Sequence, residues 1–199
     1  MKTEIQQRNF IRKQKLTFDD LKLNVIWKSY GNREELEIPF ENILPNKFDI
    51  KKNHIFLFII SSVFYLISGF VYYWRLTGDN VEDFAEVFWF SIATIFLLIA
   101  LLTREKYWQI NISNNTFIKI YKTSRNEYDV NEFITNLFEQ RNIYLLSNYG
   151  DLNLNADYEN QLNKLVWLRK MKVLDDNSYQ AKRAELDKMF STQKNKIGF

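Results

Sequence analysis

The sequence contains two long apolar stretches: IFLFIISSVFYLISGFVYYW, residues Ile55–Trp74, and VFWFSIATIFLLIALLT, residues Val87–Thr103. Neither contains Asp, Glu, Lys or Arg. A helix needs about 20 apolar residues to cross a hydrocarbon core of roughly 30 Å. The first stretch has twenty residues, and the second has seventeen and can be extended through Phe84 and Ala85. We therefore expect a two-helix transmembrane hairpin over residues 54–103.

The flanks of this hairpin are polar and rich in Asn, Lys and Glu, which is why the mean hydropathy of the 199 residues is only −0.33. The chain has no cysteine, which excludes disulfides and thiolate metal sites and fits a reducing cytosol. The one histidine, His54, precedes the first apolar stretch and is interpreted as an interfacial ring. No catalytic or metal-ligand motif is present, so we expect neither an enzyme nor a cofactor.

The basic residues next to the apolar stretches predict the orientation. Lysines precede the first stretch and Arg104 and Lys106 follow the second, whereas the connecting turn holds only Arg75. The other charged residues of the turn are acidic: Asp79, Glu82, Asp83 and Glu86. Excess Lys and Arg mark cytoplasmic segments, so both termini should be cytoplasmic and the turn Leu76–Asp83 outside. Because the N-terminus is polar, we expect no cleavable signal peptide, and a multi-pass protein of the inner (plasma) membrane.

Small residues recur within both apolar stretches. Three pairs stand seven positions apart, which places each pair on one side of a helix: Ser61 and Ser68, Ser62 and Gly69, and Ala93 and Ala100. These residues predict a helix-packing seam that either closes the hairpin on itself or pairs it with another protomer or a larger complex. The absence of charge inside the stretches argues against a transporter or pump acting alone.

The polar flanks carry strand and helix patterns. Alternation predicts a strand over Leu16–Lys28, a turn at Gly31-Asn32 and a strand over Leu36–Phe40. After the apolar stretches, residues 107–113 and 116–123 predict a β-hairpin turning at Asn114-Asn115. A helix over residues 129–148 should be capped by Asp129 and end at Gly150. We expect the strands of both flanks to form one sheet closed at one end by this helix.

This order of elements, with the segment Glu37-Ile38-Pro39-Phe40-Glu41-Asn42-Ile43 and the helix from Asn131 to Gly150, resembles the bacterial pleckstrin-homology-like (PH-like) domains of small membrane proteins. The resemblance covers Leu16 to Gly150. It implies an α+β protein in which a split cytoplasmic domain, residues 16–53 and 104–150, carries the transmembrane hairpin as an insertion. It does not imply lipid-headgroup binding, since function lies in sites rather than folds, and the sequence shows no matching cationic pocket.

The C-terminal residues 158–190 predict a short helical hairpin. The segments QLNKL (161–165), KVLDDNSY (172–179) and KRAEL (182–186) resemble the short module called SHOCT, although Lys172-Val173-Leu174-Asp175 replaces its usual glycine-containing turn. Asp175 or Asp176 should cap the second helix. The resemblance implies oligomerisation or protein contacts through one apolar face: Leu162, Leu165, Leu168, Tyr179, Leu186 and Phe190. So short a module should pack on the sheet or on another copy of itself.

The N-terminal segment, residues 1–15, is basic. Arg8, Arg12, Lys13 and Lys15 stand around Phe10-Ile11, so this segment either lies on an anionic leaflet or is solvated. The charge is spread too evenly along the chain to favour nucleic-acid binding.

The sequence therefore predicts a non-enzymatic, membrane-anchored interaction or scaffold protein. Its partners would be the lipid bilayer and either another protein or a second copy of itself. The alternative is an integral subunit of a larger membrane complex or pore. An enzyme acting at the membrane surface is the third hypothesis, for which no residues can be named.

Overall fold

The computed structural model describes residues 2–9, 12–29, 32–78, 81–123, 125–153 and 155–197, with the backbone alone for Asn9, Arg12 and 192–197. Within these residues the chain is an α+β protein with two antiparallel sheets and five α-helices. It divides into two compact units, one of residues 1–48 and 108–199 and one of residues 49–107.

The first sheet has four strands in the order β1-β2-β3-β4, all from the N-terminal flank. Their bounds are β1 Glu4–Asn9, β2 Arg12–Phe18, β3 Lys22–Ser29 and β4 Asn32–Pro39. The second sheet has the order β5-β6-β7. Its strands are β5 Ile43–Lys52, β6 Glu105–Ile112 and β7 Phe117–Tyr121. Strands from both sides of the apolar stretches do pair, but the prediction of one shared sheet is wrong, because a short 3-10 helix, η1 (Phe40–Asn42), separates β4 from β5.

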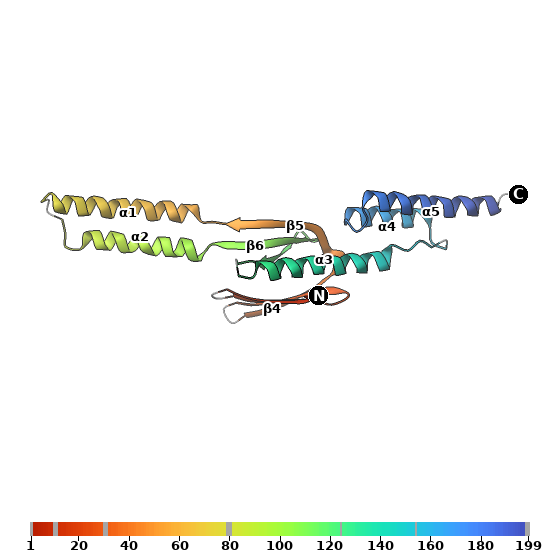
Figure 1. The fold of residues 1–199 in the computed structure, drawn as a ribbon, viewed down its shortest axis with the longest axis horizontal. Helices are drawn as coiled ribbons and strands as arrows, with labels where there is room; N and C mark the ends of the chain where they lie inside the picture. The colour runs from red at the N-terminus through yellow and green to blue at the C-terminus, as the bar shows by residue number, and fades with distance from the viewer. Residues whose placement is uncertain are drawn as a thin grey trace. The chain divides into compact units, whose positions relative to one another are not determined.

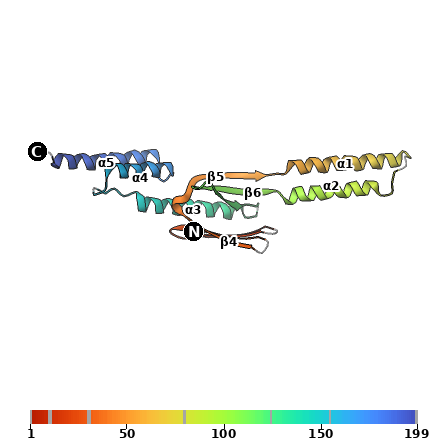
Figure 2. The ribbon, with the colours of Figure 1, turned by 180° about the vertical axis from the view of Figure 1, so that it is seen from behind.

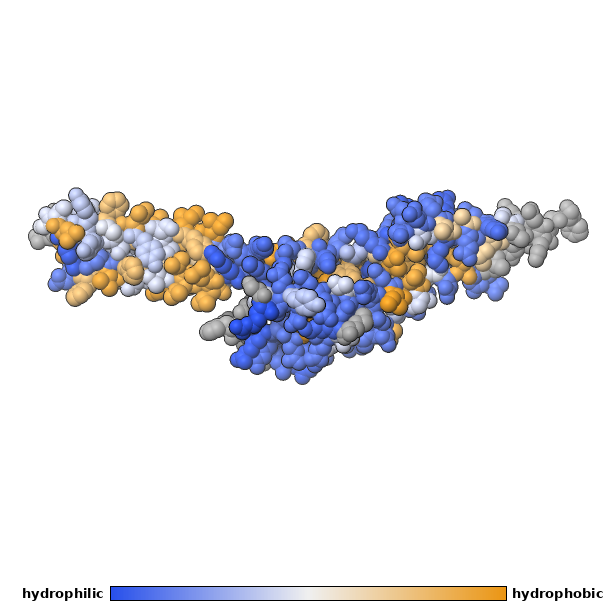
Figure 3. Space-filling model, viewed as in Figure 1, coloured by the Kyte–Doolittle hydropathy of each residue, from blue (hydrophilic) through white to orange (hydrophobic). Residues whose placement is uncertain are grey.

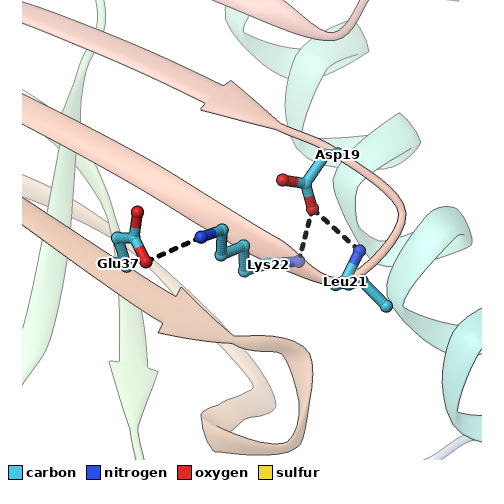
Figure 4. A network of polar contacts seen from close by, with 4 residues as sticks. All are labelled: Asp19, Leu21, Lys22 and Glu37. Atoms are coloured by element: carbon cyan, nitrogen blue, oxygen red, sulfur yellow. Dashed lines mark hydrogen bonds and ion pairs between the residues drawn. The ribbon is translucent and has the colours of Figure 1, made fainter.

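A turn interrupts the strand predicted over Leu16–Lys28. The Asp19 carboxylate accepts hydrogen bonds from the backbone N–H groups of Leu21 and Lys22, both at 2.8 Å. This local bonding ends β2 and starts β3. Lys22 then pairs with Glu37 of β4 at 2.7 Å (Figure 4).

The N-terminal residues 4–9 form a strand, contrary to the expectation of a separate basic segment. Ile5 and Gln7 of β1 and Gln14 and Leu16 of β2 are buried, and the residues between them face out. Of the sequence expectations, those on Phe10-Ile11, on Gly31 and on Asp79 fall outside the described residues.

Helix α3 (Glu127–Tyr149) closes the core of the first unit. Figure 1 shows this helix beside both sheets, and residues of all three pack into one apolar cluster that includes Leu16, Phe40, Ile110 and Phe133. The predicted helix and its end at Gly150 are confirmed. It begins after Asn126 rather than at Asp129, whose carboxylate instead pairs with Lys2 at 2.7 Å.

The predicted β-hairpin after the apolar stretches is also confirmed. Its turn contains Asn115 with a φ of 56°, a left-handed conformation that asparagine adopts more readily than most residues. The N–H of Ile112 donates to the carbonyl of Thr116 at 2.8 Å and closes the turn.

The second unit contains helices α1 (Ile55–Leu76) and α2 (Ala85–Leu102). They lie side by side in both views (Figures 1 and 2). By length and composition, each of these helices could cross a membrane.

Helices α4 (Tyr158–Lys170) and α5 (Asp176–Ile197) form the predicted helical hairpin at the C-terminus. Of the two candidate caps, Asp175 is the one used, since its carboxylate accepts the N–H of Ser178 at 2.6 Å. Helix α4 ends with Lys172 at a φ of 55° and a hydrogen bond of 3.0 Å from Val173 N–H to Leu168 O. This is the pattern in which helix termini usually place glycine, and it explains how the chain turns without one.

Candidate functional site

The interface between α1 and α2 is built from small residues. Ser61, Ser68, Ala93 and Ala100 are all buried there. The Ser61 hydroxyl donates to the carbonyl of Ala93 and the Ser68 hydroxyl to that of Glu86, each at 2.8 Å. Four of the six predicted seam residues therefore close the hairpin on itself.

The remaining predicted pair, Ser62 and Gly69, lies on another side of α1. Both residues are exposed, and a Cβ added to Gly69 would meet nothing within 4 Å. This pair takes no part in packing α1 against α2.

The outer surface of the hairpin is apolar. Large side chains such as Phe56, Leu66, Phe70, Phe88 and Leu102 are more than half exposed, and Figure 3 shows this hydrophobic surface over α1 and α2. A soluble helix pair buries its large apolar side chains and exposes its polar ones. The hairpin has the opposite arrangement, which is the one that lipid-facing helices use.

Several polar side chains of the hairpin are hydrogen-bonded within it. Ser91, Thr94 and Thr103 donate to carbonyls one turn earlier in α2. At the turn between the helices, Arg75 pairs with Glu86 at 2.8 Å and also donates to the carbonyl of Glu82. Bonds of this kind lower the cost of placing polar side chains in hydrocarbon.

The predicted apolar face of the C-terminal hairpin is used within the chain. Leu165, Leu168, Tyr179 and Leu186 are buried, and Leu162 and Phe190 pack partly buried against them. The same cluster contains Leu145 of α3, with Tyr149 at its edge. Within the chain, the face therefore packs on α3 and not on the sheet.

Sequence reasoning missed a buried arginine on α3. Arg141 is 1% exposed, and its Nε donates to the carbonyl of Ile43 at 2.8 Å. Its terminal nitrogens reach the carbonyl of Met171, at the end of α4, at 3.3 and 3.4 Å. Burial lowers the pKa of this guanidinium to about 10. The signal lay in the sequence, because Arg141 continues the buried stripe of Ile134, Leu137 and Leu145 at helical spacing.

A second cluster joins η1 to α3. The Glu41 carboxylate accepts hydrogen bonds from the hydroxyls of Tyr144 at 2.7 Å and Tyr149 at 3.1 Å. The bond to this carboxylate, with partial burial, raises the pKa of Tyr144 to about 12. Burial first, and then the bond to Glu41, raise the pKa of Tyr149. The segment Glu37–Ile43, on which the family resemblance rests, is thus a junction of strands and helix.

Two glutamine side chains bind the outer backbone of β7. Gln14 donates to the carbonyl of Lys119 at 2.8 Å, and Gln7 both donates to the carbonyl of Tyr121 and accepts from its N–H. These amides bind backbone groups of β7 that a further strand would otherwise pair, and they thereby attach β1 and β2 to the second sheet.

Over the described ranges, no three His, Asp or Glu side chains gather closely enough to hold a metal ion. Comparisons with family models, curated proteins and solved structures find no match to this chain. The functional proposal therefore rests on the arrangement of the chain's own residues.

Proposed function

We propose that this chain is a non-enzymatic, membrane-anchored interaction protein. In this proposal α1 and α2 cross the cytoplasmic membrane, both termini are cytoplasmic, and the domain built from β1–β7, α3, α4 and α5 binds a protein partner. The sequence resembles PH-like domains and the SHOCT module, and these resemblances support such a role.

One observation supports the proposal of a membrane anchor: the α1–α2 hairpin buries serine and alanine and exposes phenylalanine, leucine and isoleucine. In water, this much contiguous apolar surface would drive aggregation. In hydrocarbon it faces a matching solvent, and the buried small residues allow close helix packing.

The packing of the C-terminal hairpin bears on where a protein partner would bind. Because the apolar face of α4 and α5 packs on α3, we expect partners to be bound by the outer surfaces of the domain and not by that face. The C-terminal hairpin then acts as an integral part of the domain.

The alternative function is a subunit of a larger membrane complex or pore. The exposed pair Ser62 and Gly69 favours it, since small residues on a lipid-facing side allow a further helix to approach. The chain contains no cysteine, so Ser62→Cys can be tested alone. Oxidative cross-linking of this variant to a different membrane protein would support the alternative, and Ser91→Cys, on an exposed part of α2, is the matched control.

The proposed function is tested by extracting the tagged full chain in mild detergent and determining the mass of the purified particle. A homo-oligomer or a defined complex with a soluble partner is the expected result. A stable complex with several other membrane proteins would favour the alternative, and a monomer without any partner would contradict the interaction role.

A further inference from the structure

The outer face of the four-stranded sheet carries a row of four cations. The strand register places Arg8 opposite Lys13, Lys13 opposite Lys28, and Lys28 opposite Arg33. Register partners point to the same face of a sheet, and all four side chains are exposed. We call these four residues the basic row.

The basic row is a feature that folding alone does not favour. Like charges directly opposite one another destabilise a sheet. Arg33 pairs with Glu35 at 3.1 Å, but Arg8, Lys13 and Lys28 have no acidic partner among the residues that the structure describes. On the same face, by contrast, Lys15 pairs with Glu4 at 3.0 Å and Lys22 with Glu37 at 2.7 Å.

We infer that the basic row binds an acidic helix of a protein partner, laid across the strands. This inference names the partner chemistry of the proposed interaction function and rests on it. The charge complementarity is direct, and the geometry selects a helix. Neighbouring strands lie about 4.8 Å apart, so the four cations span roughly 14 Å.

A helix with acidic residues at positions i, i+3, i+7 and i+10 spans about 15 Å, which matches the row. Four acidic residues on one side of an extended segment would span about 20 Å and overshoot it. A flat anionic membrane surface fits less well, because three carboxylates lie on the same face: Glu35 in the next row, and Glu4 and Glu37 in the row after it. A helix along the row touches the cations and avoids those carboxylates.

The test uses the full chain in phosphatidylcholine nanodiscs and a labelled 15-residue alanine- and glutamine-rich helical peptide with glutamates at positions 2, 5, 9 and 12. Fluorescence anisotropy measures the affinity. Replacing three cations (Arg8→Gln, Lys13→Gln, Lys28→Gln) should weaken binding about tenfold, as expected for three exposed charge pairs. The control variant, Lys15→Gln with Lys22→Gln, removes two cations of the same face that are already paired and should change the affinity less than about twofold.

Folding of the triple variant is checked by thermal unfolding, and its midpoint should stay or rise because like-charge repulsion is relieved. If that midpoint falls, the single variants Arg8→Gln and Lys28→Gln, each expected to weaken binding about twofold, decide the result. A peptide of the same composition with its glutamates spread around the helix should bind weakly.

Equal effects of the triple variant and its control, or equal binding of both peptides, would overturn the assignment. Binding to phosphatidylglycerol vesicles that depends on the row and exceeds peptide binding would assign the row to a membrane surface and also overturn it. If the purified protein retains a partner in the triple variant, the interaction function stands while this inference fails.

Discussion

Arg141 on α3 donates from Nε to the carbonyl oxygen of Ile43, 98 positions earlier, at 2.8 Å. The same guanidinium reaches the carbonyl of Met171 at the end of α4. One buried cation therefore joins the start of β5, the middle of α3 and the C-terminal hairpin. Burial lowers its pKa to about 10, so it remains charged at neutral pH and its hydrogen bonds are charge-assisted.

Arg141→Met should lower the free energy of unfolding by about 2 kcal/mol, because the buried carbonyl of Ile43 loses its donor. Denaturant unfolding of the detergent-solubilised protein measures this. Arg169→Met is the control, since Arg169 forms an exposed pair with Asp176 and its loss should cost less than about 1 kcal/mol. Equal losses for the two variants would refute the role assigned to Arg141.

Tyr144→Phe should change the dependence of stability on alkaline pH. The native pKa of Tyr144 is raised to about 12, mainly by its hydrogen bond to Glu41, while an unfolded tyrosine titrates near about 10. The stability from this shift is fully present below about pH 10 and is lost as the pH rises through about 12. The lowered pKa of Arg141 acts with the opposite sign in both proteins and cancels in their comparison.

The measurement is the midpoint of denaturant unfolding at several pH values from about 9 to about 12. Wild type should lose its advantage over Tyr144→Phe across this window. Tyr128→Phe, at a position 80% exposed, is the control and should follow wild type. A constant difference between wild type and Tyr144→Phe would disprove the coupling to Glu41.

Leu186→Ala should destabilise the whole domain and not only its C-terminal hairpin. Leu186 is fully buried in the cluster that includes Leu145 of α3, and removing a buried leucine side chain costs about 3 kcal/mol. Leu162→Ala, at a partly exposed position of the same cluster, should cost about half as much. Hydrogen exchange should show faster exchange at the end of α3 in Leu186→Ala, whereas a change confined to α4 and α5 would contradict this packing.

The core of the domain is divided by the apolar stretches, which predicts how the chain can be cut. Leu23 and Phe40 before them pack in one cluster with Ile118 and Phe133 after them. Replacing residues 54–103 with a short Gly/Ser linker should therefore give a soluble, folded domain, while residues 104–199 alone should fold poorly. Circular dichroism and thermal melting decide between these outcomes, and a cooperative melt of the isolated 104–199 fragment would rule out the shared core.

Much of this architecture could be predicted from residue patterns. The two long apolar helices follow from uncharged runs, the β-hairpin around Asn115 from alternation, and the end of α3 from Gly150. In each case a local pattern dictates the element, so no long-range contact needs to be known.

The errors came where tertiary contacts override local pattern. Gln7 and Gln14 are polar, so β1 and the start of β2 were not predicted as strands, yet both side chains bind the backbone of β7. Asp19 falls inside an alternating run, but its carboxylate builds a turn. The alternation of apolar and polar residues does not reveal that an amide or carboxylate side chain is hydrogen-bonded to the backbone.

The helix-packing seam and the apolar face of α4 and α5 also show that a local pattern does not identify the packing partner. By spacing alone, Ser61 and Ser62 are equally good candidates for the seam. Ser61 is buried and Ser62 exposed because α2 packs on only one side of α1. The apolar face of α4 and α5 was recognised correctly as a packing surface, but its partner, Leu145 of α3, lies in another element.

Cysteine labelling in intact cells tests whether the hairpin is inserted in the membrane with both termini inside. The chain has no native cysteine, so single variants report single positions: Asn80→Cys, which falls outside the described residues, in the turn between the helices, and Thr3→Cys and Ser191→Cys near the termini. A membrane-impermeant maleimide should label Asn80→Cys in intact cells and the other two only after permeabilisation. Labelling of the terminal positions but not of Asn80→Cys in intact cells would reverse the orientation, and a chain recovered in the soluble fraction would contradict the anchor itself.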